Sequence, residues 1–161
     1  MPIFNTQYMV DFGHTLDIEK FPDILSLIYD GVAESPYGNV PFDQEAFEST
    51  LQEYFIGRDS DKISLILWCD NEPVGILVAV CTNNHLFFNV ERCGYELFWY
   101  VKPEHRKYNW SMQMLDMFEH WAKYRGCRRV VMGHFEKYHL GKLYQRRGYQ
   151  PFEYSYNKDL T

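Results

Sequence analysis

Two amphipathic helices are indicated in the first third of the chain. Apolar residues recur every three or four positions from residue 17 to about residue 33, which predicts a helix with one buried face. The Ser-Pro-Tyr-Gly run at 35–38 should end this helix. A second helix is predicted after Asp43, whose carboxylate suits an N-cap, and we expect it to end at Gly57.

Strand patterns dominate the middle of the chain. A weakly alternating segment at 6–12 predicts an edge strand. Residues 63–68 and 74–80 are apolar runs separated by the turn sequence Asp-Asn-Glu-Pro, so they should form an antiparallel hairpin. A third β-prone run at 95–101 should complete an antiparallel meander.

The last third alternates helices and strands. We expect a helix at 110–124 with Gly126 just beyond its end, a short strand at 129–132, a helix at 137–147 and a half-exposed terminal strand at 150–158. This order predicts an α/β fold of the α+β type, with a mixed, mostly antiparallel central sheet flanked by helices. A strand–helix–strand unit after a meander implies a parallel strand pair, which should splay and leave a cleft.

Composition narrows the class of protein. The chain has 161 residues, 46% of them hydrophobic, as expected for one globular domain spanning 1–161. Its net charge is −6 with no cluster of lysine and arginine, which disfavours nucleic acid as a partner. No apolar run approaches the roughly 20 residues that cross a bilayer, so we expect no membrane partner.

The four cysteines show no C-x-x-C pairing, and three lie in apolar, strand-like sequence. We therefore expect free thiols in a reducing cytoplasm. The histidines do not combine with them at metal-ligand spacing, so no metal site is predicted.

The segment 100–111 carries the clearest chemical signal. It reads as a buried strand, a turn after Pro103, a short polar loop and the first turn of a helix. A helix N-terminus presents unpaired N–H groups at the positive end of the helix dipole, which suits a phosphate. The order resembles the acetyl-CoA-binding motif of the GNAT superfamily of N-acetyltransferases, whose loop is written [Q/R]-x-x-G-x-[G/A]. Arg106 matches its first position, Asn109 stands for the first glycine and Ser111 for the small residue.

The resemblance implies acetyl-CoA as co-substrate. The loop N–H groups would hold the pyrophosphate, and the preceding strand would bind the pantetheine arm through its backbone. Asn109 tolerates a left-handed conformation and could replace glycine there, while Trp110 would either pack on the adenine or fill core. The implied binding residues are Trp99, Tyr100, Val101, Arg106, Lys107, Tyr108, Asn109, Trp110 and Ser111.

Acetyl transfer to an amine also needs a base and a group that stabilises the leaving thiolate. The run Leu-Tyr-Gln-Arg-Arg-Gly-Tyr at 143–149 resembles a family signature whose tyrosine serves as general acid, and Tyr144 matches it. Its ordinary pKa of about 10 is near that of a leaving thiol. For the base, a carboxylate in the β-rich run at 95–98 must be exposed, paired or functional. Glu96 is therefore the first candidate, with Glu91, His134 and Glu136 as alternatives.

The resemblance implies an N-acetyltransferase that uses acetyl-CoA on a primary amine of a small molecule or protein. The alternative is a module of the same fold that binds a protein partner, with or without CoA, and has lost catalysis. The C-terminal run from His139 to Tyr149 looks most like the small acetyltransferases of bacteriophages, which would place the protein in the host cytoplasm, and a homodimer is a further expectation. An aromatic acceptor pocket is predicted from Phe21, Tyr29, Tyr37, Tyr54, Phe87, Phe88, Tyr154 and Tyr156.

Overall fold

The computed structural model describes residues 7–38, 43–55, 60–83, 91–106 and 109–152, together with 155 and 158. Five strands form one sheet in the order β1-β2-β3-β4-β5, and four α-helices and several short 3-10 turns accompany it. The strands are β1 Tyr8–Phe12, β2 Lys62–Cys69, β3 Glu72–Thr82, β4 Cys93–Val101 and β5 Arg129–Val131. The helices are α1 Phe21–Glu34, α2 Gln44–Phe55, α3 Trp110–Tyr124 and α4 Gly141–Arg146.

The sheet is mixed, as predicted. β1 to β4 pair antiparallel in sequence order, and β5 pairs parallel to β4. The β2–β3 turn has Asp70 and Asn71 at φ 50° and 68°, the left-handed pair that a two-residue hairpin needs. The predicted edge strand is confirmed as β1.

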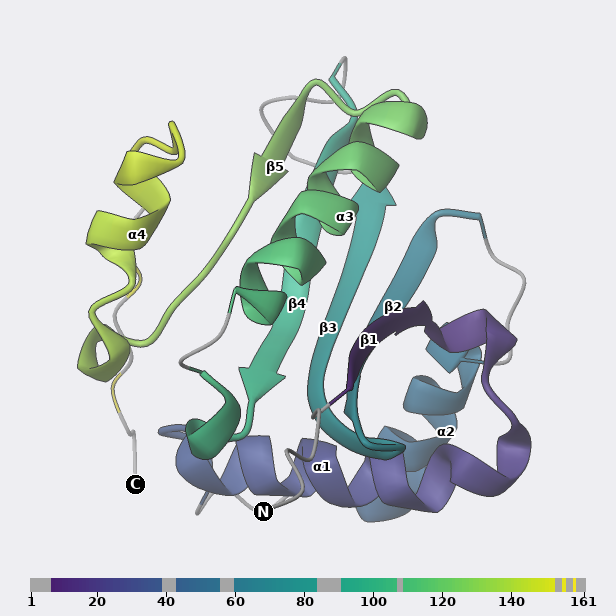
Figure 1. The fold of residues 1–161 in the computed structure, drawn as a ribbon. Helices are drawn as coiled ribbons and strands as arrows, with labels where there is room; N and C mark the ends of the chain where they lie inside the picture. The colour runs from purple at the N-terminus through teal and green to yellow at the C-terminus, as the bar shows by residue number, and fades with distance from the viewer. Residues whose placement is uncertain are drawn as a thin grey trace.

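Helices cover both faces of the sheet (Figure 1), α3 lying on one and α1 and α2 on the other. Side chains of β2 and β3 alternate between the two layers, with Leu65 under α3 and Ile66 under α1 and α2, both fully buried. Gly31 lets α1 approach β4 closely, because a Cβ there would lie 2.6 Å from the ring of Phe98. These contacts hold β4 between the two helical layers.

The helix boundaries follow local chemistry. The predicted helix at 17–33 begins as α1 only at Phe21, since Pro22 favours the first turn, and residues 18–20 form a 3-10 turn instead. The carboxylate of Asp43 accepts the N–H of Ala46 at 3.0 Å, confirming the predicted N-cap of α2. Gly57, the expected end of that helix, lies outside the described residues. The predicted bounds of α3 are confirmed, with Gly126 at φ 77° after it.

One prediction near the C-terminus is wrong, and a second finds no support at the described residues. The helix expected at 137–147 is split into a 3-10 turn, Glu136–Tyr138, and α4, because His139 between them adopts φ 50°. The strand expected at 150–158 is not found at the described residues 150–152, 155 and 158. A strand needs a partner, and along the described chain β5 is paired only with β4.

Candidate functional site: the splay between β4 and β5

β4 and β5 separate after a short paired stretch. Their pairing runs from Cys93↔Arg129 to Tyr95↔Val131, and β4 continues to Val101 paired only with β3 among the described strands. The chain beyond β5 runs away from β4 toward α4 (Figure 1). This confirms the predicted splay and leaves the β4 backbone from Glu96 onward without a β5 partner.

A β-bulge in β4 sets the direction of the side chains there. Ala79 of β3 pairs with Glu96 but Val78 pairs with Phe98, so Leu97 is the extra residue. Glu96 and Trp99 consequently share the α3 face of the sheet, since their partners both belong to the core under α3. The sequence carries no glycine at this point, and our sequence reasoning missed the bulge.

Glu96 and Tyr144 are joined through the backbone of Gly133. The N–H of Gly133 donates to the Glu96 carboxylate at 3.1 Å. The Tyr144 hydroxyl donates to the carbonyl oxygen of Gly133, also at 3.1 Å. The structure therefore brings together two predicted residues from β4 and α4. Gly133 was not predicted, although a glycine just beyond the end of a strand is a recognisable signal for close backbone approach.

The titration of this pair is strongly perturbed. Burial raises the pKa of Glu96 to about 7, and the hydrogen bond from Gly133 only partly opposes it. Burial, and then the charge of Glu96, raise the pKa of Tyr144 above its ordinary range. The expected match between the pKa of this tyrosine and that of a thiol is therefore wrong, because its surroundings disfavour the phenolate.

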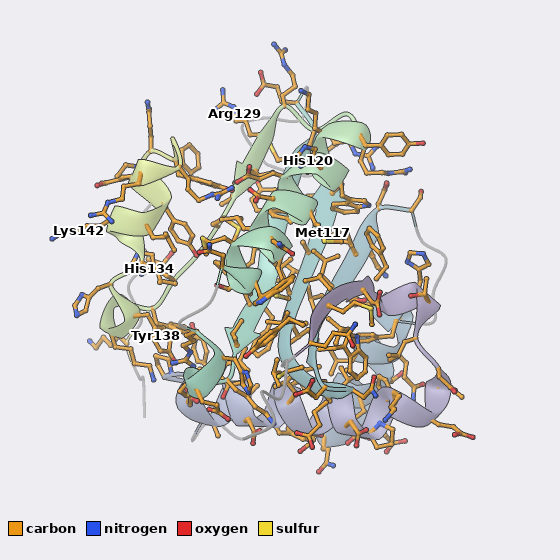
Figure 2. All side chains as sticks on the ribbon, viewed as in Figure 1. Met117, His120, Arg129, His134, Tyr138 and Lys142 are labelled. Atoms are coloured by element: carbon orange, nitrogen blue, oxygen red, sulfur yellow. The ribbon has the colours of Figure 1, made fainter. Side chains whose placement is uncertain are left out.

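Three further rings surround Tyr144. Its ring lies 6.5 Å from Trp99, 5.8 Å from His134 and 5.5 Å from Tyr149. The Trp99 indole N–H is buried and finds no acceptor among the described residues. His134 is exposed on the segment between β5 and α4 (Figure 2), with Nδ1 3.1 Å from the carbonyl oxygen of Phe135. It lies beside Tyr144, and no contact joins it to Glu96 among those described.

The predicted phosphate loop ends in the α3 N-terminus. Asn109 occupies the N-cap position with φ −66°, so the idea that it replaces glycine in a left-handed conformation is wrong. Among the described residues no side chain caps this helix, and its first turn holds no acidic residue, which leaves its positive end available to an anion. Ser111 lies in that first turn. Lys107 and Tyr108 lie outside the described residues.

Of the two roles considered for Trp110, the structure shows core packing. Its ring stacks on Tyr8 of β1, with centroids 5.5 Å apart. The Tyr8 hydroxyl in turn contacts Nδ1 of His105 at 2.9 Å. These contacts fix the start of α3 against the edge strand.

Arg106 is engaged by protein groups. Its Nε donates to the carbonyl oxygen of Val101 at 2.7 Å, and its guanidinium pairs with the Glu34 carboxylate at 2.8 Å. The same guanidinium lies over the rings of Tyr100 and Tyr138, 5.5 and 5.7 Å from their centroids. The predicted phosphate ligand is thus held between α1, β4 and the turn before α4.

Glu34 is the centre of this cluster. Its carboxylate also accepts the Tyr100 hydroxyl at 2.7 Å, while its backbone carbonyl accepts Lys137 and Tyr138. Burial alone would raise the pKa of Glu34, but the hydrogen bonds from Arg106 and Tyr100 outweigh it and hold the pKa low. The cluster ties the end of α1 to the open end of the splay.

The structure does not place Glu91 or Glu136, the other candidates for the base, at the splay. Glu91 forms ion pairs with Arg128 and Arg129. Figure 2 shows Arg129 at the far end of β5 from Tyr138. The side chain of Glu136 lies outside what the structure describes. Across the described part of the chain, no group of three His, Cys, Asp or Glu side chains could hold a metal ion.

The structure describes only some of the residues predicted to form the acceptor pocket. Phe21 is wrongly placed in it, because this ring is buried in the core against Phe55. Tyr29 donates to Glu48 at 2.8 Å, and the Tyr37 ring packs edge-on against Phe135. Phe87, Phe88, Tyr154 and Tyr156 lie outside the described residues.

A hollow of the described surface lies elsewhere, over α3. Its volume is about 560 Å³, and Figure 2 shows two of its lining residues on α3. It is lined by Phe12, Gln113, Asp116, Met117, His120, Trp121 and Tyr124. None of these residues belongs to the Glu96–Gly133–Tyr144 arrangement, so the hollow does not define the site. None of the helices described is both long and apolar enough to span a bilayer.

Comparisons with known proteins agree with this geometry. Residues 25–149 match the model of the acetyltransferase (GNAT) family. A search of curated proteins finds no match.

Solved structures show the same fold at low sequence identity. An aminoglycoside N-acetyltransferase in complex with CoA superposes with a TM-score of 0.74 at 13% identity, over 100% of both chains. A predicted acetyltransferase from Clostridium acetobutylicum, solved with acetyl-CoA, gives 0.70 at 14% identity over 96% of each chain. An aminoglycoside 6'-N-acetyltransferase from Acinetobacter baumannii gives 0.71 at 13% identity, covering 96% of this chain and 100% of that one.

Proposed function

Because the chain belongs to the GNAT acetyltransferase family, we propose that it transfers the acetyl group of acetyl-CoA to a primary amine, with the reaction at the splay between β4 and β5. One observation carries the proposal. A carboxylate with a pKa near 7 and a protonated tyrosine meet through a single residue, Gly133, beside a strand edge that has no partner among the described strands. Perturbed titratable groups at such a place are typical of active sites.

The described residues fit acetyl-CoA in three respects. The β4 backbone beyond Glu96 can pair with the amides of the pantetheine arm. The uncapped start of α3 can accept the pyrophosphate. The buried indole N–H of Trp99 is a donor in need of an acceptor, which a carbonyl oxygen of the thioester or pantetheine would supply.

Glu96 is proposed as the general base. In neutral solution a primary amine is mostly protonated. The resulting ammonium ion must lose a proton before its nitrogen can attack the thioester. A carboxylate whose pKa is about 7 is largely ionised above that pH and still basic enough to take the proton. His134, exposed beside Tyr144, is the alternative base.

Tyr144 is proposed to stabilise the leaving thiolate. Its raised pKa keeps the hydroxyl protonated at physiological pH, so it acts as a hydrogen-bond donor. In the structure that proton points to the carbonyl oxygen of Gly133. Rotation about the C–O bond of the phenol would redirect it toward the sulfur.

The acceptor is proposed to be a cationic amine. The acidic net charge of −6 favours cations. Aminoglycosides, on which two of the similar structures are named to act, belong to this class, and so do polyamines, lysine side chains and peptide N-termini. The test is release of free thiol from acetyl-CoA with these amines supplied separately.

A binding module without catalysis is the second candidate. It is favoured because Arg106 is already ion-paired with Glu34, and the Tyr144 hydroxyl already donates to the carbonyl oxygen of Gly133. Calorimetry separates the two. Acetyl-CoA binding without thiol release on any amine would support the module, whereas thiol release that depends on both Glu96 and an amine would support the enzyme. The phage-type origin, the cytoplasmic location and the homodimer stay predictions.

A further inference from the structure

Two cysteine thiols meet at the closed end of the splay. Cys81 lies near the end of β3, and Cys127 lies in the turn between α3 and β5. Their Sγ atoms are 3.1 Å apart although 46 positions separate the residues in sequence. A covalent S–S bond is about 2.05 Å long, so closing it needs a sulfur displacement of only about 1 Å.

Backbone hydrogen bonds hold both residues in place. The N–H of Cys127 donates to the carbonyl oxygen of Ala122 at 2.9 Å, continuing the end of α3. The N–H of Cys81 donates to the carbonyl oxygen of Asp61 at 2.7 Å. The two thiols are therefore juxtaposed by the regular structure around them and not by a chance rotamer of a loose loop.

The two thiols differ in access. Cys81 is only 3% exposed, whereas Cys127 is half-buried and reaches the surface. An oxidant from solution therefore meets Cys127 first, and Cys81 can respond only through Cys127. This is the usual division between an attacking and a resolving cysteine.

Charged groups lie beside the pair. Burial raises the pKa of the Cys81 thiol and the neighbouring Cys127 raises it further, while the positive charge of Arg92 acts in the opposite direction. The guanidinium groups of Arg92 and Arg125 both bind the Asp61 carboxylate next to the thiols. The charge of Asp61 also raises the pKa of Cys81, which keeps Cys81 a protonated thiol until Cys127 has reacted.

We propose that Cys81 and Cys127 form a reversible disulfide under oxidising conditions. With a small-molecule disulfide as oxidant, the Cys127 thiolate attacks one sulfur and releases one small thiol, leaving a mixed disulfide. The Cys81 thiol then loses its proton and attacks Sγ of Cys127, which releases the second small thiol. Two protein thiols and one disulfide thus become one protein disulfide and two small thiols.

The bond would brace the scaffold at the closed end of the splay. It links β3 to the turn before β5 and closes a loop that contains β4 and α3. Gly133 and Tyr144 lie beyond β5, outside that loop, whereas Glu96 lies within it, on the part of β4 that β5 does not pair with. Oxidation is thus expected to stabilise the fold while the open end of the splay keeps its shape.

The test uses the native protein and oxidised glutathione. After incubation and alkylation of the remaining thiols, intact mass should show two of the four cysteines protected, and peptide mapping should link Cys81 to Cys127. The oxidised protein should melt roughly 10 °C higher than the reduced one, because the bond closes a long loop of the unfolded chain.

Matched variants fix the assignment. Cys127→Ser should abolish both the link and the rise in melting temperature. Cys69→Ser should keep both. Cys69 of β2 pairs with Glu72 of β3, and nine residues of extended strand between Glu72 and Cys81 span roughly 30 Å. Cys93→Ala should also keep both, and it tests the other thiol near Cys127. Four free thiols after oxidation, a Cys127–glutathione adduct that never resolves, or a link to Cys93 would each overturn the proposal.

Discussion

Replacing Glu96 with Gln should make the protein more stable at neutral and alkaline pH while removing its base. The carboxyl group has a pKa of about 7 in the folded protein against 4.5 in an unfolded chain, because burial disfavours its charged form. Stability from the protonated form is fully present below pH 4.5 and is lost as pH rises through 7. Gln is neutral at every pH and can still accept the N–H of Gly133.

The size of the effect follows from the shift in pKa. One unit corresponds to about 1.36 kcal/mol, so Glu96→Gln should gain up to roughly 3 kcal/mol at pH 8 and close to nothing at pH 4. For a chain of this length the gain corresponds to a rise in melting temperature of roughly 5–10 °C.

The assay is urea unfolding of both proteins from pH 4 to pH 8. The difference between the two free energies of unfolding isolates Glu96, because every other titrating group is shared. The same pH range should show kcat/KM of the wild type rising toward a plateau above pH 7. A difference in stability that does not change with pH would refute the burial argument, and a variant with full activity would remove Glu96 as the base.

Four further substitutions test the site and its surroundings. Tyr144→Phe should lower turnover by about 10²–10⁴-fold, with little change in stability or CoA affinity. Melting and turnover are measured on both proteins. A lower melting temperature with a proportionate loss of activity would make Tyr144 a core residue. Arg106→Ala should weaken CoA binding tenfold to a hundredfold if the guanidinium meets a phosphate. Glu34→Gln should strengthen CoA binding by up to about fivefold, because it releases Arg106. An unchanged calorimetric affinity in both variants would mean that Arg106 only holds the Glu34 cluster together. Gly31→Ala should cost about 1–3 kcal/mol in urea unfolding, because the new methyl would overlap the rings that α1 packs on; a neutral result would show that α1 can shift from the sheet.

The fold was predictable because its signals are local. The 3.6-residue period and Gly126 predict both ends of α3 correctly. The sequence Asp70-Asn71 predicts the β2–β3 hairpin, where both residues adopt positive φ. The failures lie where tertiary contacts override local pattern. The expected helix through His139 breaks because the turn before it is anchored on the end of α1 through Lys137 and Tyr138.

The candidate site was predictable in its residue types but not in its connections. A glutamate in a β-rich run and a tyrosine in a signature segment identify Glu96 and Tyr144. Their link depends on the backbone of Gly133 and on a bulge in β4, and neither leaves a clear trace in a single sequence. Likewise, the pairing of Arg106 with Glu34 spans 72 positions, which no local pattern reports.

Calorimetric titration with acetyl-CoA tests the central claim most directly. The account predicts saturable binding of one molecule per chain with micromolar affinity. Ligand at about 100 times its dissociation constant should then add roughly 2.7 kcal/mol to the free energy of unfolding. No heat of binding, together with an unchanged melting temperature at millimolar CoA, would contradict the assignment of the splay between β4 and β5 as a site for acetyl-CoA.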